Sequence, residues 1–113
     1  MTIINVKYDE LDEVLEKNYE NEELIDEAPY EIDLGDGDEA LVTVDSPFYR
    51  VTDKDLIVAE GTYLRRENGS YEPDFSLSVV YENVPDEEFD PSKWLYWEQD
   101  PPTTAIHNYL NTI

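Results

Sequence analysis

Residues 55–82, DLIVAEGTYLRRENGSYEPDFSLSVVYE, predict the hairpin around which the rest of the fold is built. The segment 55–67 is rich in the β-branched and aromatic residues that favour strands. Asn68-Gly69 follows it, and this dipeptide is the strongest short-range signal for a two-residue hairpin turn. After the turn, four apolar residues recur at every second position and so share one face of a second strand: Phe75, Leu77, Val79 and Tyr81.

The turn also predicts which residues face one another across the hairpin. With two residues in the loop, Arg65 lies opposite Glu72, and opposite charges in such a pair stabilise a sheet. Gly61 interrupts the first strand, where an isolated glycine indicates a β-bulge. The hairpin is therefore expected to carry one cross-strand ion pair and one irregularity.

Shorter strands are predicted before and after the hairpin. Alternating apolar residues and flanking turn residues, such as GDGD at 35–38, support them. They are TIINVK (2–7), YEIDL (30–34), EALVTV (39–44), FYRV (48–51) and an edge strand within WLYW (94–97). Because most of these strands follow one another across short turns, we expect an antiparallel meander of about five strands.

Near the N-terminus, the stretch DELDEVLEKNYENEELIDE at 9–27 holds ten carboxylates and one base, Lys17. From residue 9 the apolar side chains have helical spacing, and the acids fall on the opposite face. The apolar face consists of Leu11, Val14, Leu15 and either Asn18 or Tyr19. The stripe breaks after Tyr19, so the helix either ends near Asn18 or bends and continues to Asp26. Pro29 ends any helix before it.

A second, shorter helix is predicted at the C-terminus. DPPTT at 100–104 introduces it, with Thr103 or Thr104 as the expected N-cap. Its apolar stripe consists of Ile106, Tyr109, Leu110 and Ile113. An acidic amphipathic helix, a meander and a short helix together predict one α+β domain spanning residues 1–113.

The chain carries 29 acidic and 7 basic residues among 113, a formal net charge of −22. Aromatic residues make up 12%, which favours a folded domain over an acidic disordered chain. Phosphates and anionic lipids are repelled by such a charge, so we expect a basic protein as partner, with no direct nucleic acid and no membrane. Salt-loving organisms also make acidic proteins, but nine Tyr are not typical of them.

Catalytic and metal-binding signatures are missing from the sequence. It has no Cys and one histidine, His107, so zinc, iron and copper sites lack their usual ligands. DLGDGDEA at 33–40 fails the spacing of a calcium loop, because glycine or apolar residues occupy ligand positions. We therefore expect no enzyme, no cofactor and no metal. The absence of Cys fits a reducing compartment, taken here as the cytoplasm of a bacterial host.

The acidic helix is the predicted working surface. Solvated helix faces normally mix charges of both signs, whereas this one has a single base among ten acids. The residues expected to contact the partner are Asp9, Asp12, Glu13, Glu16, Glu20, Glu22 and Glu23. The sequence leaves the oligomeric state open, and a homodimer would extend the charged surface.

In size, acidity and lack of motifs the chain resembles DNA-mimic inhibitors, of which phage anti-restriction and anti-CRISPR proteins are examples. That resemblance implies a non-enzymatic acidic protein that blocks a basic DNA- or RNA-binding protein. One alternative is an immunity or antitoxin-type protein that neutralises a basic toxin. Another is a small hydrolase that uses paired carboxylates, which a buried Asp or Glu with a raised pKa in a concave pocket would favour.

Overall fold

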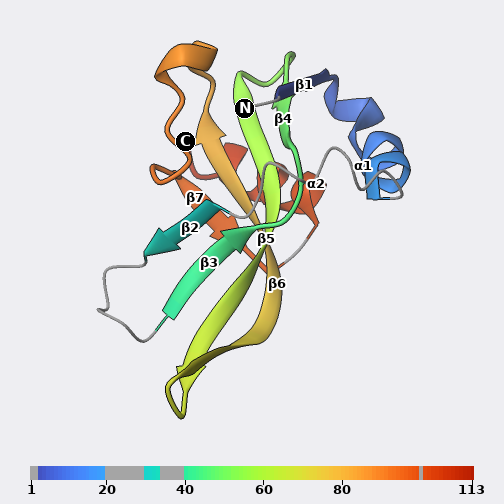
Figure 1. Ribbon diagram of the computed structural model, residues 1–113. Helices are drawn as coiled ribbons and strands as arrows, with labels where there is room; N and C mark the ends of the chain where they lie inside the picture. The colour runs from blue at the N-terminus through green and yellow to red at the C-terminus, as the bar shows by residue number, and fades with distance from the viewer. Residues whose placement is uncertain (1–2, 20–29, 34–39, 100) are drawn as a thin grey trace.

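The computed structural model describes residues 3–19, 30–33, 40–99 and 101–113, and Figure 1 shows their arrangement. The described strands form a seven-stranded mixed sheet, which two α-helices accompany, so the predicted α+β class is confirmed. The strands are β1 Ile3–Val6, β2 Tyr30–Asp33, β3 Ala40–Val44, β4 Phe48–Val51, β5 Leu56–Glu67, β6 Ser70–Glu82 and β7 Tyr96–Glu98. The helices are α1 Leu11–Tyr19 and α2 Pro102–Leu110, with short 3-10 turns η1 Tyr8–Glu10 and η3 Asp86–Glu88.

The predicted hairpin is the longest feature of the sheet. β5 and β6 pair antiparallel from Leu56 to Glu67, and their turn projects away from the helices at the bottom of Figure 1. Asn68 and Gly69 have φ of 53° and 84°, as a two-residue turn with left-handed backbone requires. The hairpin and its turn are therefore confirmed.

The register of the hairpin is confirmed, but the ion pair differs from the prediction. Arg65 lies opposite Glu72 as expected, yet its guanidinium pairs with Asp74 at 3.5 Å. The pairing shifts by one residue between Tyr63 and Leu64, where β6 contains Asp74 as an extra residue. The bulge brings the Asp74 carboxylate within reach of the Arg65 side chain.

β3 and β4 behave as one bent strand along the same side of β5. β3 pairs with Gly61–Arg65 and β4 with Leu56–Val58. At the bend, the N–H groups of Asp45 and Ser46 donate to the Glu60 carbonyl, at 2.9 and 3.3 Å. When β3 and β4 are taken as one strand, each strand from β2 to β7 pairs antiparallel with the next one along the chain, as a meander requires. The strand predicted at 2–7 is confirmed as β1, but it pairs parallel with β4 at the edge of the sheet, which an antiparallel meander does not predict.

Gly61 is needed for close packing of backbones and does not itself form a bulge. It pairs with Val44 on one side and Leu77 on the other. A Cβ at this position would lie 2.5 Å from the carbonyl oxygen of Thr43. The irregularities lie beside it, at the bend opposite Glu60 and at the shift after Tyr63, so the bulge predicted at Gly61 is wrong in position.

The sheet is covered on both faces by different parts of the chain. On one face, the two helices pack on side chains of β1, β4, β5 and β6. The buried residues of this cluster are Val6, Leu11, Leu15, Tyr49, Val51, Leu56, Val58, Val80, Ala105 and Ile106. On the other face, Phe89 from the segment after β6 closes a second cluster with Val42, Val44, Phe48, Ile57, Ala59, Leu77, Val79 and Tyr81. The alternation predicted for β6 is thereby confirmed.

The N-terminal helix lies where the apolar stripe predicts it. Leu11 and Leu15 are buried and Val14 is half-buried. At its start, the Tyr8 N–H donates to the Asp53 carboxylate at 2.9 Å, and the Tyr8 hydroxyl donates to the carbonyl of Thr103 at 3.2 Å. The second contact joins the start of one helix to the other. α1 extends to Tyr19, and the predicted continuation to residue 26 falls outside the described residues.

The C-terminal helix begins earlier than predicted. Pro101 is the N-cap and Pro102 occupies the first turn, so Thr103 and Thr104 lie inside the helix and the predicted N-cap is wrong. Proline suits this position because the first turn leaves its N–H groups unpaired and needs a φ that proline already has. The apolar stripe packs as expected at Ile106, whereas Ile113 is 82% exposed beyond the helix end.

Replacing Gly61 with Ala tests the close approach at the centre of the sheet. The added methyl group meets the Thr43 carbonyl, so we expect a loss of roughly 1–3 kcal/mol in the free energy of unfolding, measured with urea. Gly69→Asn is the comparison for backbone strain without a clash, because nothing lies within 4 Å of an added Cβ there but the φ of 84° is one that L side chains rarely adopt. Equal stability of Gly61→Ala and the parent protein would contradict the packing argument.

Candidate functional site

The acidic face of η1 and α1 is exposed along its length. Asp9, Asp12, Glu13 and Glu16 all lie at exposed positions, while Leu11 on the opposite side is completely buried. The helical spacing makes residues three and four apart neighbours, so these carboxylates form one ridge. Four of the seven predicted contact residues are thus placed together. The other three, Glu20, Glu22 and Glu23, fall outside the described residues.

Few cations accompany this ridge in the described part of the chain. Lys17 pairs with Glu13 at 3.1 Å, but both side chains are more than 70% exposed, at 73% and 71%. A pair in contact with this much water contributes little to stability. Lys54 lies 5.3 Å from the ring centre of Tyr8, where it is engaged with an aromatic side chain. The ridge therefore keeps most of its negative charge.

A second acidic segment begins at the last residue of β6 and was not among the predicted contact residues. Its exposed acids are Glu82, Asp86, Glu87, Glu88 and Asp90. Arg50 holds this segment in place, because its guanidinium donates to Asn83, to Asp86 and, at 3.1 Å, to the carbonyl of Val84. Its side chain is only 17% exposed, so this cation serves an internal contact. The run of acids at 86–90 is the sequence signal that could have predicted a second acidic surface.

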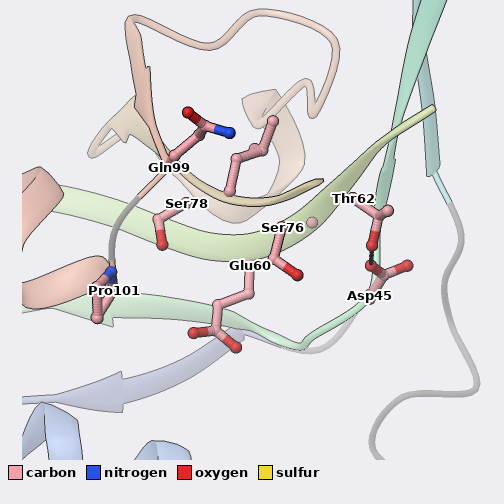
Figure 2. Close-up of a pocket in the computed structure, with 9 residues that line it drawn as sticks. Asp45, Glu60, Thr62, Ser76, Ser78, Gln99 and Pro101 are labelled. Atoms are coloured by element: carbon pink, nitrogen blue, oxygen red, sulfur yellow. Dashed lines mark hydrogen bonds between the residues drawn. The ribbon is translucent and has the colours of Figure 1, made fainter. Parts of the chain in front are cut away.

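Beside the start of α2 lies a pocket of about 450 Å³ that is lined by two carboxyl groups (Figure 2). It is lined by Asp45, Glu60, Gly61, Thr62, Ser76, Leu77, Ser78, Gln99 and Pro101. Figure 2 shows Glu60 in the middle, with Pro101 on one side and Asp45 on the other. The Asp45 carboxylate accepts hydrogen bonds from the Thr62 hydroxyl and, at 3.1 Å, from the Thr43 hydroxyl.

Burial raises the pKa of the Glu60 carboxyl above its usual 4.5. The cause is the removal of water from the charged form, which disfavours ionisation. Glu60 follows Leu56 and Val58 at two-residue steps along β5, so it continues the stripe that packs under the helices. An acid at the next position of an inward-facing stripe is the sequence signal for this site, which was not among the predicted functional residues.

The single histidine, His107, lies at an exposed position of α2.

Comparisons of the chain with protein-family models, with curated proteins and with solved structures gave no match. Within the described residues, neither helix has the length and apolar composition needed to cross a membrane.

The raised pKa of Glu60 predicts a pH dependence of stability. The folded protein holds this proton more tightly than the unfolded chain, so the contribution of Glu60 is most favourable below pH 4.5 and is lost as pH rises through the folded-state pKa. We expect Glu60→Gln to be more stable than the parent protein at pH 7, with the difference shrinking towards pH 4. Urea unfolding at a series of pH values measures this change.

The control for this experiment is Glu67→Gln, at an exposed position near the end of β5. Removing any acid relieves some repulsion in so negative a chain, and the control measures that general gain. The difference between the two variants isolates the effect of burial. Identical pH profiles for the two variants would be inconsistent with a raised pKa at Glu60.

Proposed function

We propose that this protein is a non-enzymatic inhibitor that occupies a basic nucleic-acid-binding site by presenting carboxylates where phosphates normally lie. The observation that carries the proposal is the exposed acidic ridge of Asp9, Asp12, Glu13 and Glu16, fixed to the core through Leu11 and Leu15. The partner would be a DNA- or RNA-binding enzyme or complex. The protein would act in the cytoplasm of a bacterial host, encoded by a phage or mobile element.

The charge spacing of the ridge supports the comparison with a nucleic acid. Residues 9–17 contain five acids and one base, a net charge of −4. As a helix this segment is about 13 Å long, at ~1.5 Å per residue. One net charge per roughly 3.4 Å equals the phosphate spacing along a single DNA strand. A groove that accepts a nucleic-acid strand therefore meets a similar average charge per unit length on the ridge.

The energetics also favour a basic partner. Like charges held along the ridge repel one another, and this repulsion is relieved when Lys and Arg side chains come close. Because the buried residues of α1 hold the ridge in place before binding, little conformational freedom is lost there on association. Long-range attraction should speed the encounter, and added salt should weaken it.

Charge reversal on the ridge tests the proposal. The variant with Asp12→Lys, Glu13→Lys and Glu16→Lys should fold as stably as the parent, because all three positions are exposed and repulsion is relieved. Immobilised parent protein should capture a nucleic-acid-binding protein from bacterial lysate at low salt and release it at high salt. The reversed variant should lose this capture by more than ten-fold, measured by quantitative mass spectrometry.

The matched control reverses three exposed acids of the projecting hairpin, Glu67→Lys, Glu72→Lys and Asp74→Lys, and gives the same net charge. It should retain most of the captured partner. If the ridge variant binds as well as the control, the helical face is not the working surface. Capture of a basic toxin that has no nucleic-acid-binding activity would instead favour the antitoxin-type function.

The Glu60 pocket favours one second candidate, a small carboxylate hydrolase. A carboxyl group in a concave site with a raised pKa is suited to donate a proton to a leaving group. Asp45 lines the same pocket and would serve as the second carboxylate. This pair was the type of feature expected to distinguish a hydrolase from an inhibitor.

Turnover of chromogenic glycosides by the purified protein tests this second candidate. A hydrolase should lose about 100-fold or more of its rate with Glu60→Gln or Asp45→Asn, since each removes one of the reacting groups. Glu67→Gln should keep the parent rate. Absence of turnover by the parent protein across a panel of glycosides, at pH 4 to 8, would count against this candidate.

A further inference from the structure

A groove with a largely apolar wall lies between the end of α2 and the turn that joins β4 to β5. Its volume is about 430 Å³. The residues that line this α2 groove are Lys54, Asp55, Leu56, Glu82, Leu95, Tyr109, Leu110 and Ile113. Most of them are aliphatic or aromatic, whereas the Glu60 pocket is lined mostly by polar groups.

Two large apolar side chains of the α2 groove are exposed to water. Leu95 is 48% exposed and Ile113 is 82% exposed. Within the described residues, the other large side chains of this kind that are exposed are Tyr71 on β6 and Trp97 on β7. Exposed apolar groups gathered beside a hollow are typical of a surface that a protein partner covers.

The fold holds the walls of the α2 groove in place. Leu56 is buried in the cluster beneath the helices, and Tyr109 and Leu110 pack against the same cluster. The N–H of Leu95 donates to the Val80 carbonyl at 2.7 Å, which fixes that residue against β6. Because the groove is formed before binding, little conformational freedom is lost when a side chain enters it.

The charges around the groove favour a basic partner. Asp55 and Glu82 line the groove, and Asp53 lies at an exposed position of the same turn. The cation among the described lining residues, Lys54, lies 5.3 Å from the ring centre of Tyr8. An apolar residue flanked by Lys or Arg is therefore attracted here, and one flanked by acids is repelled. A second copy of this chain would bring a further net charge of −22 and is disfavoured for the same reason.

The groove adjoins the start of the acidic ridge. Tyr8 is the first residue of η1, and Asp9, the first acid of the ridge, follows it directly. The Tyr8 N–H donates to the Asp53 carboxylate at 2.9 Å, and Lys54 lies over the Tyr8 ring and also lines the groove. One partner can therefore contact the start of the ridge and the groove together.

We propose that the α2 groove receives a leucine-like side chain from a basic segment of the partner, an inference that rests on the proposed function. The apolar side chain packs against Leu95, Leu110 and Ile113. Lys or Arg residues that flank it in the partner pair with Asp55 and Glu82. The ridge then supplies the long-range attraction, and the groove adds a requirement for an apolar residue beside the basic ones.

Two peptides of equal charge test the groove without the partner. Acetyl-Lys-Lys-Leu-Lys-Lys-amide should bind about five-fold more tightly than the same peptide with Ala in place of Leu, because only leucine fills the groove. In a titration followed by NMR, the leucine peptide should shift the methyl resonances of Leu95, Leu110 and Ile113. The alanine peptide measures the attraction of the acidic surface alone.

Substitutions in the protein locate the binding site of the leucine. Leu95→Asn removes an exposed part of the wall and keeps the backbone hydrogen bond, so it should fold and lose the preference for the leucine peptide. Ile113→Asn, beyond the end of α2, is a second variant for which we expect the same loss. Tyr71→Asn is the matched control, because it replaces an exposed aromatic residue at the far end of the β5–β6 hairpin, and it should keep the preference.

Several outcomes would overturn this inference. Equal affinity of the parent for the leucine and alanine peptides, or a leucine preference that survives in both Asn variants of the groove, would remove the assignment of the groove. Equally tight binding of acetyl-Glu-Glu-Leu-Glu-Glu-amide would remove the basic partner. A dimer in analytical ultracentrifugation that Leu95→Asn dissociates would assign the groove to a second copy of the chain. The peptide comparison does not depend on the ridge, because the charge-reversal experiment judges the proposed function separately.

Discussion

The backbone of β5 is hydrogen-bonded on both sides, and the positions of the other elements follow from that pairing. β6 runs along one side for the full length of the strand, while β3 and β4 share the other side. The two short strands join only by bending opposite Glu60, where the Ser46 hydroxyl accepts the Glu60 N–H at 2.8 Å. The half-buried Glu60 lies at the margin of the core beside this bend. It lines the pocket at the start of α2 together with Asp45, which belongs to the bend.

The parts of the fold that depend on short-range chemistry could be predicted from the sequence. Asn68-Gly69 determines its own turn because both residues tolerate positive φ, and the register of β5 and β6 follows from the turn. The amphipathic spacing of Leu11 and Leu15 likewise predicted the buried face of α1 correctly. In both cases the residues that form the sequence pattern lie within a few positions of one another in the chain.

The parts that depend on distant residues could not be predicted. β1 pairs in parallel with β4, which lies about 45 residues further along the chain. Neither strand has a local sequence pattern that predicts this pairing. Arg65 pairs with Asp74 instead of Glu72, because a one-residue shift moves the carboxylate. The acidic ridge was predicted in part because charge is visible in a sequence. The Glu60 pocket was missed because it is formed by segments that meet only in the folded chain.

The bulge at Asp74 has a consequence for self-association. β7 pairs only with Ser78–Val80, so in the described structure the outer edge of β6 from residue 70 to residue 77 has no neighbouring strand. Such an edge normally templates another strand and leads to aggregation. Here Pro73 has no N–H to offer, and the extra residue beside it breaks the regular spacing of the remaining groups. The same irregularity that redirects one ion pair therefore also disfavours strand pairing between the projecting hairpins of separate molecules.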